Sequence, residues 1–109
     1  MSKNTWKIFE NKICRMFKGQ RRGADYADQD GGKNDCVGTL GWSMEIKTMK
    51  RPTWGIMTED AKKAVARKEK PSDIGIAVMH KKQQGVPWKN NTYVVMTLDE
   101  FMDHFGDSE

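Results

Sequence analysis

The sequence predicts an α/β fold in which a mixed central β-sheet is flanked by helices. Residues 42–47 alternate between apolar and polar side chains, as in a half-buried strand. Residues 74–79 form an unbroken apolar run, which is typical of a central strand buried on both faces. A helical segment separates these two strands, so they can pair in parallel through a right-handed crossover. The predicted element order is α-β-β-α-β-β-α.

The first helix is predicted over residues 6–17 and ends at Gly19. Its apolar side chains share one face: Trp6, Phe9, Ile13, Met16 and Phe17. The polar, glycine-rich residues 23–34 predict a loop. A short strand follows at residues 36–37, and a tight turn joins it to the strand at 42–47 as a β-hairpin.

The second helix is predicted over residues 58–68, where Glu59 and Asp60 in the first turn suit the helix dipole. Its apolar stripe consists of Met57, Ala61, Ala64 and Val65. A further strand is predicted at residues 93–96. Thr97 and Glu100 have the spacing of a capping box, which predicts a short helix with an apolar side made of Leu98, Phe101, Met102 and Phe105.

The composition fits one small domain over residues 1–109, with 37% hydrophobic and 31% charged residues. No apolar run approaches the ~18 residues of a membrane helix, and no secretory signal is recognisable. We therefore expect no membrane partner and a cytoplasmic location, in the host cytoplasm if a phage encodes the chain. In such a reducing compartment, Cys14 and Cys36 are expected to be small core residues. A chain of this size often gains stability as a homodimer.

Positive charge is concentrated outside the C-terminal segment. Residues 1–97 carry 19 basic and 10 acidic side chains, a net charge of +9, within a chain of net charge +4. Such a surface favours a polyanion, with a merely well-solvated surface as the alternative. The residues expected to contact DNA phosphates are Arg15, Arg21, Arg22, Lys62, Lys63 and Arg67.

Asp35, Glu45 and Lys47 form the candidate chemical centre. Glu45 and Lys47 are two residues apart on a strand, so both leave the same face about 7 Å apart. The predicted hairpin can bring the Asp35 carboxylate beside Glu45. Neighbouring carboxylates repel unless a cation lies between them, and hard oxygen ligands suit Mg²⁺. The alternative interpretation of Glu45 and Lys47 is an ordinary charged strand face.

This pattern, with Glu10 on the preceding helix, resembles the PD-(D/E)xK nuclease superfamily, which has a restriction-endonuclease-like core. The matching residues are Asn34-Asp35 and Glu45-Ile46-Lys47. The nearest likeness is to the archaeal-type Holliday-junction resolvases, in which a helical Glu precedes the Asp by a distance similar to the 25 residues between Glu10 and Asp35. The sequence departs from these families at Asn34, where the motif has Pro, and at Asn11, where the archaeal enzymes have Arg.

The resemblance implies a role for each residue of the site. Asp35, Glu45, Glu10 and the Ile46 carbonyl would bind Mg²⁺, for which Mn²⁺ is expected to substitute. Lys47 would be the catalytic lysine, and Arg21 or Arg22 would be the arginine that binds phosphate.

The function implied is a Mg²⁺-dependent endonuclease that resolves four-way DNA junctions by paired symmetric nicks during recombination and repair. A C2 homodimer would supply the two sites. Two alternatives remain open: a nuclease of this fold that acts on nicked, flapped or duplex DNA, and a non-catalytic DNA-binding module. Trp54 and Trp88 are expected to complete the local core, to pack at the dimer interface or to stack on unpaired bases.

Overall fold

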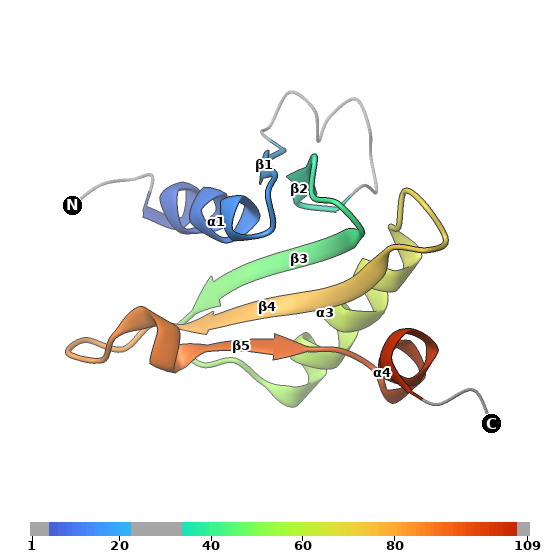
Figure 1. Cartoon of the computed structure of the whole chain (residues 1–109). Coiled ribbons are helices and arrows are strands. Elements are labelled where there is room, and N and C mark those ends of the chain that lie inside the picture. Colours follow the sequence, from blue (N-terminus) through green and yellow to red (C-terminus); the bar gives the residue numbers. More distant parts are fainter. Residues whose placement is uncertain (1–4, 23–33, 107–109) are drawn as a thin grey trace.

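The structure is a computed structural model that describes residues 5–22 and 34–106 (Figure 1). Most of the loop predicted at residues 23–34 therefore lies outside the described residues. The elements in chain order are α1 (Thr5–Met16), β1 (Gln20–Arg21), β2 (Cys36–Val37), β3 (Trp42–Met49), α3 (Trp54–Ala66), β4 (Ile74–Lys81), the 3-10 helix η1 (Trp88–Asn91), β5 (Thr92–Val95) and α4 (Leu98–Phe105).

The main sheet is mixed, as the sequence predicts. Its strand order is β3-β4-β5, with β3 parallel and β5 antiparallel to the central strand β4. The apolar run in β4 is buried from Gly75 to Met79, which confirms a strand covered on both faces. The chain is thus an α/β protein, with α3 connecting the two parallel strands.

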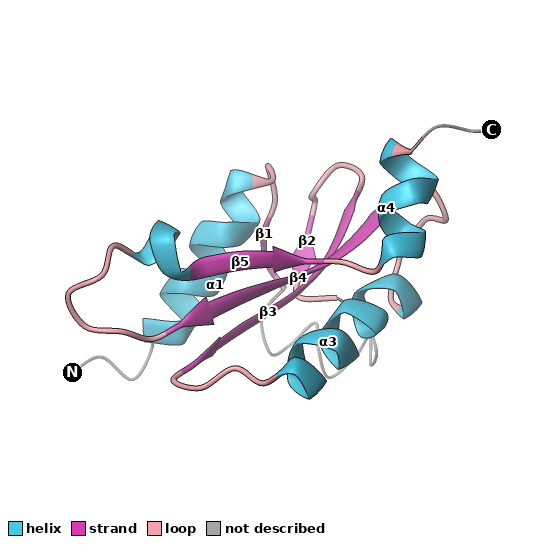
Figure 2. Ribbon diagram, turned by 90° about the horizontal axis from the view of Figure 1, so that it is seen from below, coloured by secondary structure: helices cyan, strands magenta, loops and turns pink. Residues whose placement is uncertain are grey.

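Helices α1 and α3 cover opposite faces of the main sheet (Figure 2). Alternate residues of β4 point to the two faces, because side chains alternate along a strand. Ile76 and Val78 pack in the cluster that contains Phe9 and Ile13 of α1. Ala77 and Met79 pack in the cluster that contains Ala61 of α3. On β3, the predicted alternation of apolar and polar side chains between the two faces is also confirmed. Met44 and Ile46 pack in the cluster that contains Phe9 and Ile13. Ser43, on the other face, donates a hydrogen bond to the Ala64 carbonyl in α3.

The predicted hairpin between residues 36–37 and 42–47 is wrong. β2 pairs instead with β1, a two-residue strand that the sequence did not predict, in a separate antiparallel sheet. A Cβ on Gly19 would lie 2.5 Å from the Val37 carbonyl oxygen, so only glycine allows this close approach of β1 and β2. The Asp35 N–H still donates to the Met44 carbonyl at 2.8 Å, which joins the start of β2 to β3.

Helix α3 begins at Trp54, earlier than residue 58. The Thr53 side chain accepts a hydrogen bond from the Ile56 N–H, so Thr53 is the N-cap. Glu59 and Asp60 consequently lie inside the helix and not in its first turn, where they were expected. Asp60 is buried, with 3% of its surface exposed.

Cys14 and Cys36 are buried, as predicted, but they form a disulfide that connects α1 to β2. The expectation of two separate core cysteines is therefore corrected. Disulfides are rare in reducing compartments, so this bond lends no support to the cytoplasmic location expected from the sequence.

Only one of the two hydrogen bonds of the predicted capping box is present at the start of helix α4. The Thr97 hydroxyl accepts from the Glu100 N–H at 3.1 Å. The Glu100 carboxylate accepts instead from the Gly75 N–H at 2.7 Å and pairs with Lys68. The apolar side of α4 is exposed. None of the helices in the described part of the chain is long and apolar enough to cross a membrane.

Candidate functional site

Asp35 is fixed to β3 by its backbone and its side chain. Its N–H donates to the Met44 carbonyl at 2.8 Å. Its Oδ2 accepts from the Ile46 N–H at 2.6 Å. These two bonds flank Glu45 in the sequence, so Asp35 lies beside the strand that carries Glu45. The proximity predicted for Asp35 and Glu45 is thus present, although the hairpin that was to produce it is not.

Glu45 and Lys47 point from β3 toward α3. Glu45 is buried, with 7% of its surface exposed. Its Oε1 accepts from the Arg67 guanidinium at 3.0 Å, just beyond the end of α3. Its Oε2 is also buried and has no hydrogen-bond partner among the described residues. An unpaired buried carboxylate oxygen is unfavourable, so it is a place where a cation or water would be stabilised.

Asp60 is the member of the site that the sequence interpretation missed. The Lys47 ammonium lies 3.2 Å from Asp60 Oδ2 and forms an ion pair without hydrogen-bond geometry. A signal for this burial is present in the sequence. Met57, Asp60, Ala61 and Ala64 have the i, i+3, i+4, i+7 spacing of one helix face, so Asp60 fills a core position opposite β3.

Glu10 approaches the same site from α1. Its Oε1 pairs with Arg21 Nε at 2.9 Å. Arg21 is held in β1, where its backbone N–H donates to the Asn11 side chain at 3.1 Å. Asn11, the departure from the resolvase pattern, therefore positions the strand that carries Arg21.

The three carboxylates influence one another through Asp35. Burial raises the pKa of Glu10 from its usual 4.5 to about 7; the negative charge of Asp35 adds to this rise, and Arg21 opposes it. Burial raises the pKa of Glu45 to about 7 as well, again with a contribution from Asp35 and with Arg67 opposing. Burial also raises the pKa of Asp35, while the hydrogen bond from Ile46 lowers it. Such mutual repulsion is relieved by a cation.

The basic residues expected to contact DNA fall into different environments. Arg15 and Lys62 are exposed. Lys63 is half-buried and lies 3.8 Å from Glu59 and 4.0 Å from Asp60. Arg21 and Arg67 are paired with Glu10 and Glu45, at the candidate site itself.

Arg22 differs most from its expected role as a phosphate contact. It is buried, with 6% of its surface exposed. Its guanidinium donates to the carbonyls of Asn34 at 2.7 Å and Cys36 at 3.0 Å, and pairs with Glu69 at 2.7 Å. Arg22 thus joins the ends of the segment that leads to Asp35 and is not available to a DNA phosphate.

Among residues 5–22 and 34–106, no three His, Cys, Asp or Glu side chains converge closely enough to form a ready metal site. Arg21, Arg67 and Lys47 are instead the groups that neutralise the carboxylates. Ile46 joins the site through its N–H, which binds Asp35. The donor set suits a hard divalent ion, because it consists of carboxylate oxygens, one of which has no partner.

Comparison of the chain with protein-family models, with curated proteins and with solved structures finds no match.

Proposed function

We propose that this chain is a metal-dependent DNA endonuclease of the PD-(D/E)xK type, and that it cuts four-way junctions. One observation carries the proposal: Asp35 is hydrogen-bonded to the backbone of the strand that bears Glu45 and Lys47. This arrangement gathers two carboxylates and an ammonium at one edge of β3. The element order around it is compatible with the restriction-endonuclease-like core.

Asp35, Glu45 and Glu10 are the residues that would hold Mg²⁺, with the Ile46 carbonyl as a further oxygen ligand and Mn²⁺ as a substitute. Support comes from the raised pKa values of the three carboxyls and from the unpaired Glu45 Oε2. A bound divalent ion would lower the pKa of a water and neutralise charge on the phosphate.

Lys47 and the arginines contribute positive charge for the reaction itself. The water oxygen loses a proton to solvent and attacks phosphorus in line with the leaving O3′. The new P–O bond forms as the P–O3′ bond breaks, O3′ takes a proton from solvent, and a 5′-phosphate and a 3′-hydroxyl are left. Lys47 orients this water or stabilises the phosphorane oxygens, because its ammonium is held by Asp60 beside Glu45. Arg21 and Arg67 supply charge to attract the scissile phosphate to the carboxylates.

A four-way junction needs two symmetric nicks, and each chain offers one site. A C2 dimer would therefore place two sites on one junction. The exposed Arg15 and Lys62 would bind phosphates and respond to the shape of the branch more than to base sequence.

The test is cleavage of labelled four-way junction, flap and linear duplex DNA in Mg²⁺, with EDTA as the blank. Paired symmetric cuts on the junction alone support the proposal. Equal cutting of all three substrates retains the nuclease chemistry but rejects junction selectivity. Binding without any cut, in Mg²⁺ or Mn²⁺, rejects the nuclease proposal.

A further inference from the structure

A groove lies between the first half of α1 and the ends of β3 and β4, and none of the carboxylates of the candidate site lines it. Its volume is about 610 Å³. Aromatic and basic side chains dominate its lining, which includes Trp6, Phe9, Lys12, His80, Lys82 and Trp88. We call this feature the aromatic groove.

The aromatic rings form a connected surface in the groove. Phe9 stacks on His80, with ring centroids 4.6 Å apart and an interplanar angle of 29°. The edge of Trp88 meets Phe9 at 5.7 Å. Trp6 completes the lining with 46% of its surface exposed. Two tryptophans thus line the groove, and Phe9, stacked on His80, contacts the ring of Trp88.

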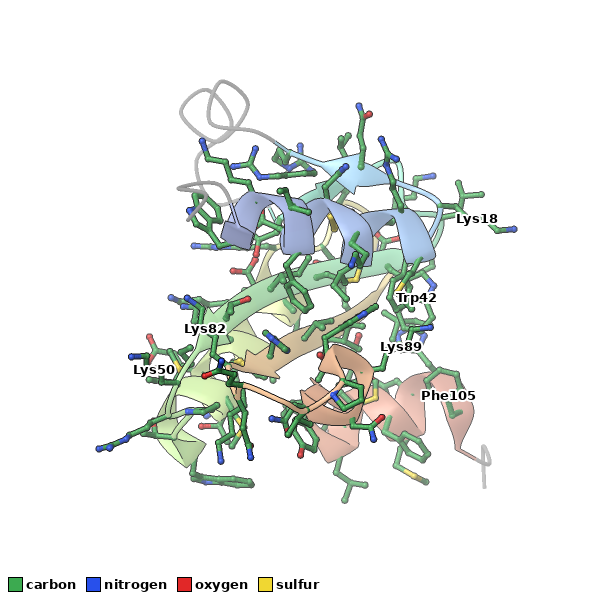
Figure 3. All side chains as sticks on the ribbon, turned by 90° about the vertical axis from the view of Figure 1, so that its left-hand side faces the viewer. Lys18, Trp42, Lys50, Lys82, Lys89 and Phe105 are labelled. Carbon is green, nitrogen blue, oxygen red and sulfur yellow. A yellow bond between two sulfur atoms is a disulfide. The ribbon has the colours of Figure 1, made fainter. Side chains whose placement is uncertain are left out.

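The charge lining the aromatic groove has one sign. Lys12, Lys50 and Lys82 are exposed lining residues. Figure 3 shows Lys50 and Lys82 near one another where β3 and β4 end. The Lys12 ammonium lies 4.9 Å from the centre of the Trp88 ring. No Asp or Glu is among the described residues that line the groove, so the groove is complementary to an anion that carries a flat ring.

Arg21 connects the groove to the candidate site. Its guanidinium carbon lies 5.1 Å from the centre of the Trp6 ring. The same side chain pairs with Glu10 at 2.9 Å. Trp6 and Glu10 are also one turn apart on α1, so they lie on the same side of the helix. A chain of phosphates leaving the groove past Arg21 would therefore reach the carboxylates.

We propose that the aromatic groove binds unpaired nucleotides of a single DNA strand. The bases stack on Trp6 and Trp88, and the phosphates lie near Lys12, Lys50 and Lys82. Bases within a duplex are already stacked on one another, so only an unpaired segment can use the tryptophan rings. This inference rests on the proposed nuclease function in one respect: the bound strand would lead past Glu10 to the site where the DNA is cut. Binding itself requires no cleavage.

The experiment measures the affinity of the full chain for fluorescein-labelled dT12 and for a blunt duplex by anisotropy, in EDTA so that nothing is cut. Three variants change the groove. Two are the single substitutions Trp6→Ala and Trp88→Phe, and the third is a double variant that carries both Lys50→Gln and Lys82→Gln. The matched controls are Phe105→Ala, which removes an aromatic side chain that is 54% exposed on α4, and Lys70→Gln, which removes an exposed lysine outside the groove.

Trp6→Ala should weaken dT12 binding about tenfold, as expected for the loss of one stacked base, and should change duplex binding less than twofold. The double lysine variant should weaken dT12 binding and reduce its salt dependence. Trp88→Phe keeps a ring in the core and should give a smaller loss than Trp6→Ala. An abasic 12-mer has no bases that could stack on a tryptophan, so it should bind wild type and Trp6→Ala equally.

The proposal is overturned if the groove variants bind dT12 as tightly as the two controls do, or if Trp6→Ala weakens duplex and dT12 binding by the same factor. Trp6 is 46% exposed, so its loss should leave the folded structure intact, and thermal unfolding of the variant checks this. Failure of cleavage with intact dT12 binding would reject the nuclease function alone. Cleavage with unchanged dT12 binding in every groove variant would reject the groove alone.

Discussion

The Lys47 ammonium lies 3.2 Å from the buried Oδ2 of Asp60, so a residue of α3 holds the lysine that β3 brings to the candidate site. The Lys47 side chain is 41% exposed, whereas that of Asp60 is 4% exposed. One end of the pair is thus fixed in the core and the other reaches the site. In the proposed nuclease, Asp60 would therefore be a positioning residue for Lys47.

Asp60→Asn should lower the rate of junction cleavage about tenfold, because the amide keeps the shape of the side chain but removes the charge that holds Lys47. Lys47→Gln should lower the rate at least about 100-fold. In the Lys47→Gln background, Asp60→Asn should have little further effect, since its role acts through Lys47. Single-turnover rates of the four proteins test this. Full additivity of the two losses would show that Asp60 acts independently of Lys47.

The pH dependence of stability follows from Glu10 and Glu45, whose pKa values are raised from 4.5 to about 7 in the folded chain. Between these values the folded state binds more protons than the unfolded state. The free energy of unfolding should therefore fall as the pH rises from 4.5 to 7 and then level off. Urea unfolding in EDTA at pH 5 and pH 8 should differ by more than about 1 kcal/mol.

The control for the pH prediction is the Glu10→Gln, Glu45→Gln double variant, which cannot titrate at these positions. Its stability should change less between the same two pH values. A wild-type protein that becomes more stable as the pH rises through this range would contradict the assignment of raised pKa values to these two carboxyls.

Arg21 and Arg22 are adjacent in the sequence but should behave oppositely. Arg22→Lys should lower the free energy of unfolding by about 2 kcal/mol, because lysine cannot reproduce the bonds to Asn34, Cys36 and Glu69. Arg21→Lys should leave stability within about 1 kcal/mol and weaken DNA binding. Chemical denaturation and junction binding of the two variants provide the comparison. If the Arg22→Lys protein is as stable as the wild type but binds DNA more weakly, Arg22 contacts a DNA phosphate, as the sequence predicts.

The Cys14–Cys36 disulfide closes a segment with a sequence separation of 22 residues. Its removal by the double substitution Cys14→Ser, Cys36→Ser should lower the free energy of unfolding by about 3 kcal/mol, from loop-closure entropy. Dithiothreitol should destabilise the wild-type protein and leave the double variant unchanged. Equal melting temperatures of the wild type with and without reductant, together with two reactive thiols in the purified protein, would contradict the disulfide.

The sequence predicts those features that depend on local pattern. The central strand β4 is recognisable from its unbroken apolar run, and the two faces of β3 are recognisable from alternation at Met44, Glu45 and Ile46. The start of α3 is not predicted, because the apolar stripe begins only at Met57, whereas the Thr53 cap and the first turn precede it.

Features that depend on distant partners could not be predicted in the same way. The sequence predicts that β2 pairs with β3, its neighbour in sequence, but its partner β1 is only two residues long and carries no periodicity of its own. The burial of Arg22 likewise depends on a group far along the chain, Glu69. Asp35 lies beside Glu45, as predicted, but for a different reason: its two hydrogen bonds, with Met44 and Ile46, replace the hairpin ladder.

The most direct measurement is Mg²⁺-dependent cleavage of a labelled four-way junction by the wild type, by Asp35→Asn and by the control Asp99→Asn, which changes an exposed acid on α4. The wild type and the control should make paired symmetric nicks at equal rates. Asp35→Asn should cut at least about 100-fold more slowly while it still binds the junction. Cutting by Asp35→Asn at the wild-type rate, or no cutting by the wild-type protein, would contradict the assignment of Asp35 and its neighbours on β3 as a nuclease site.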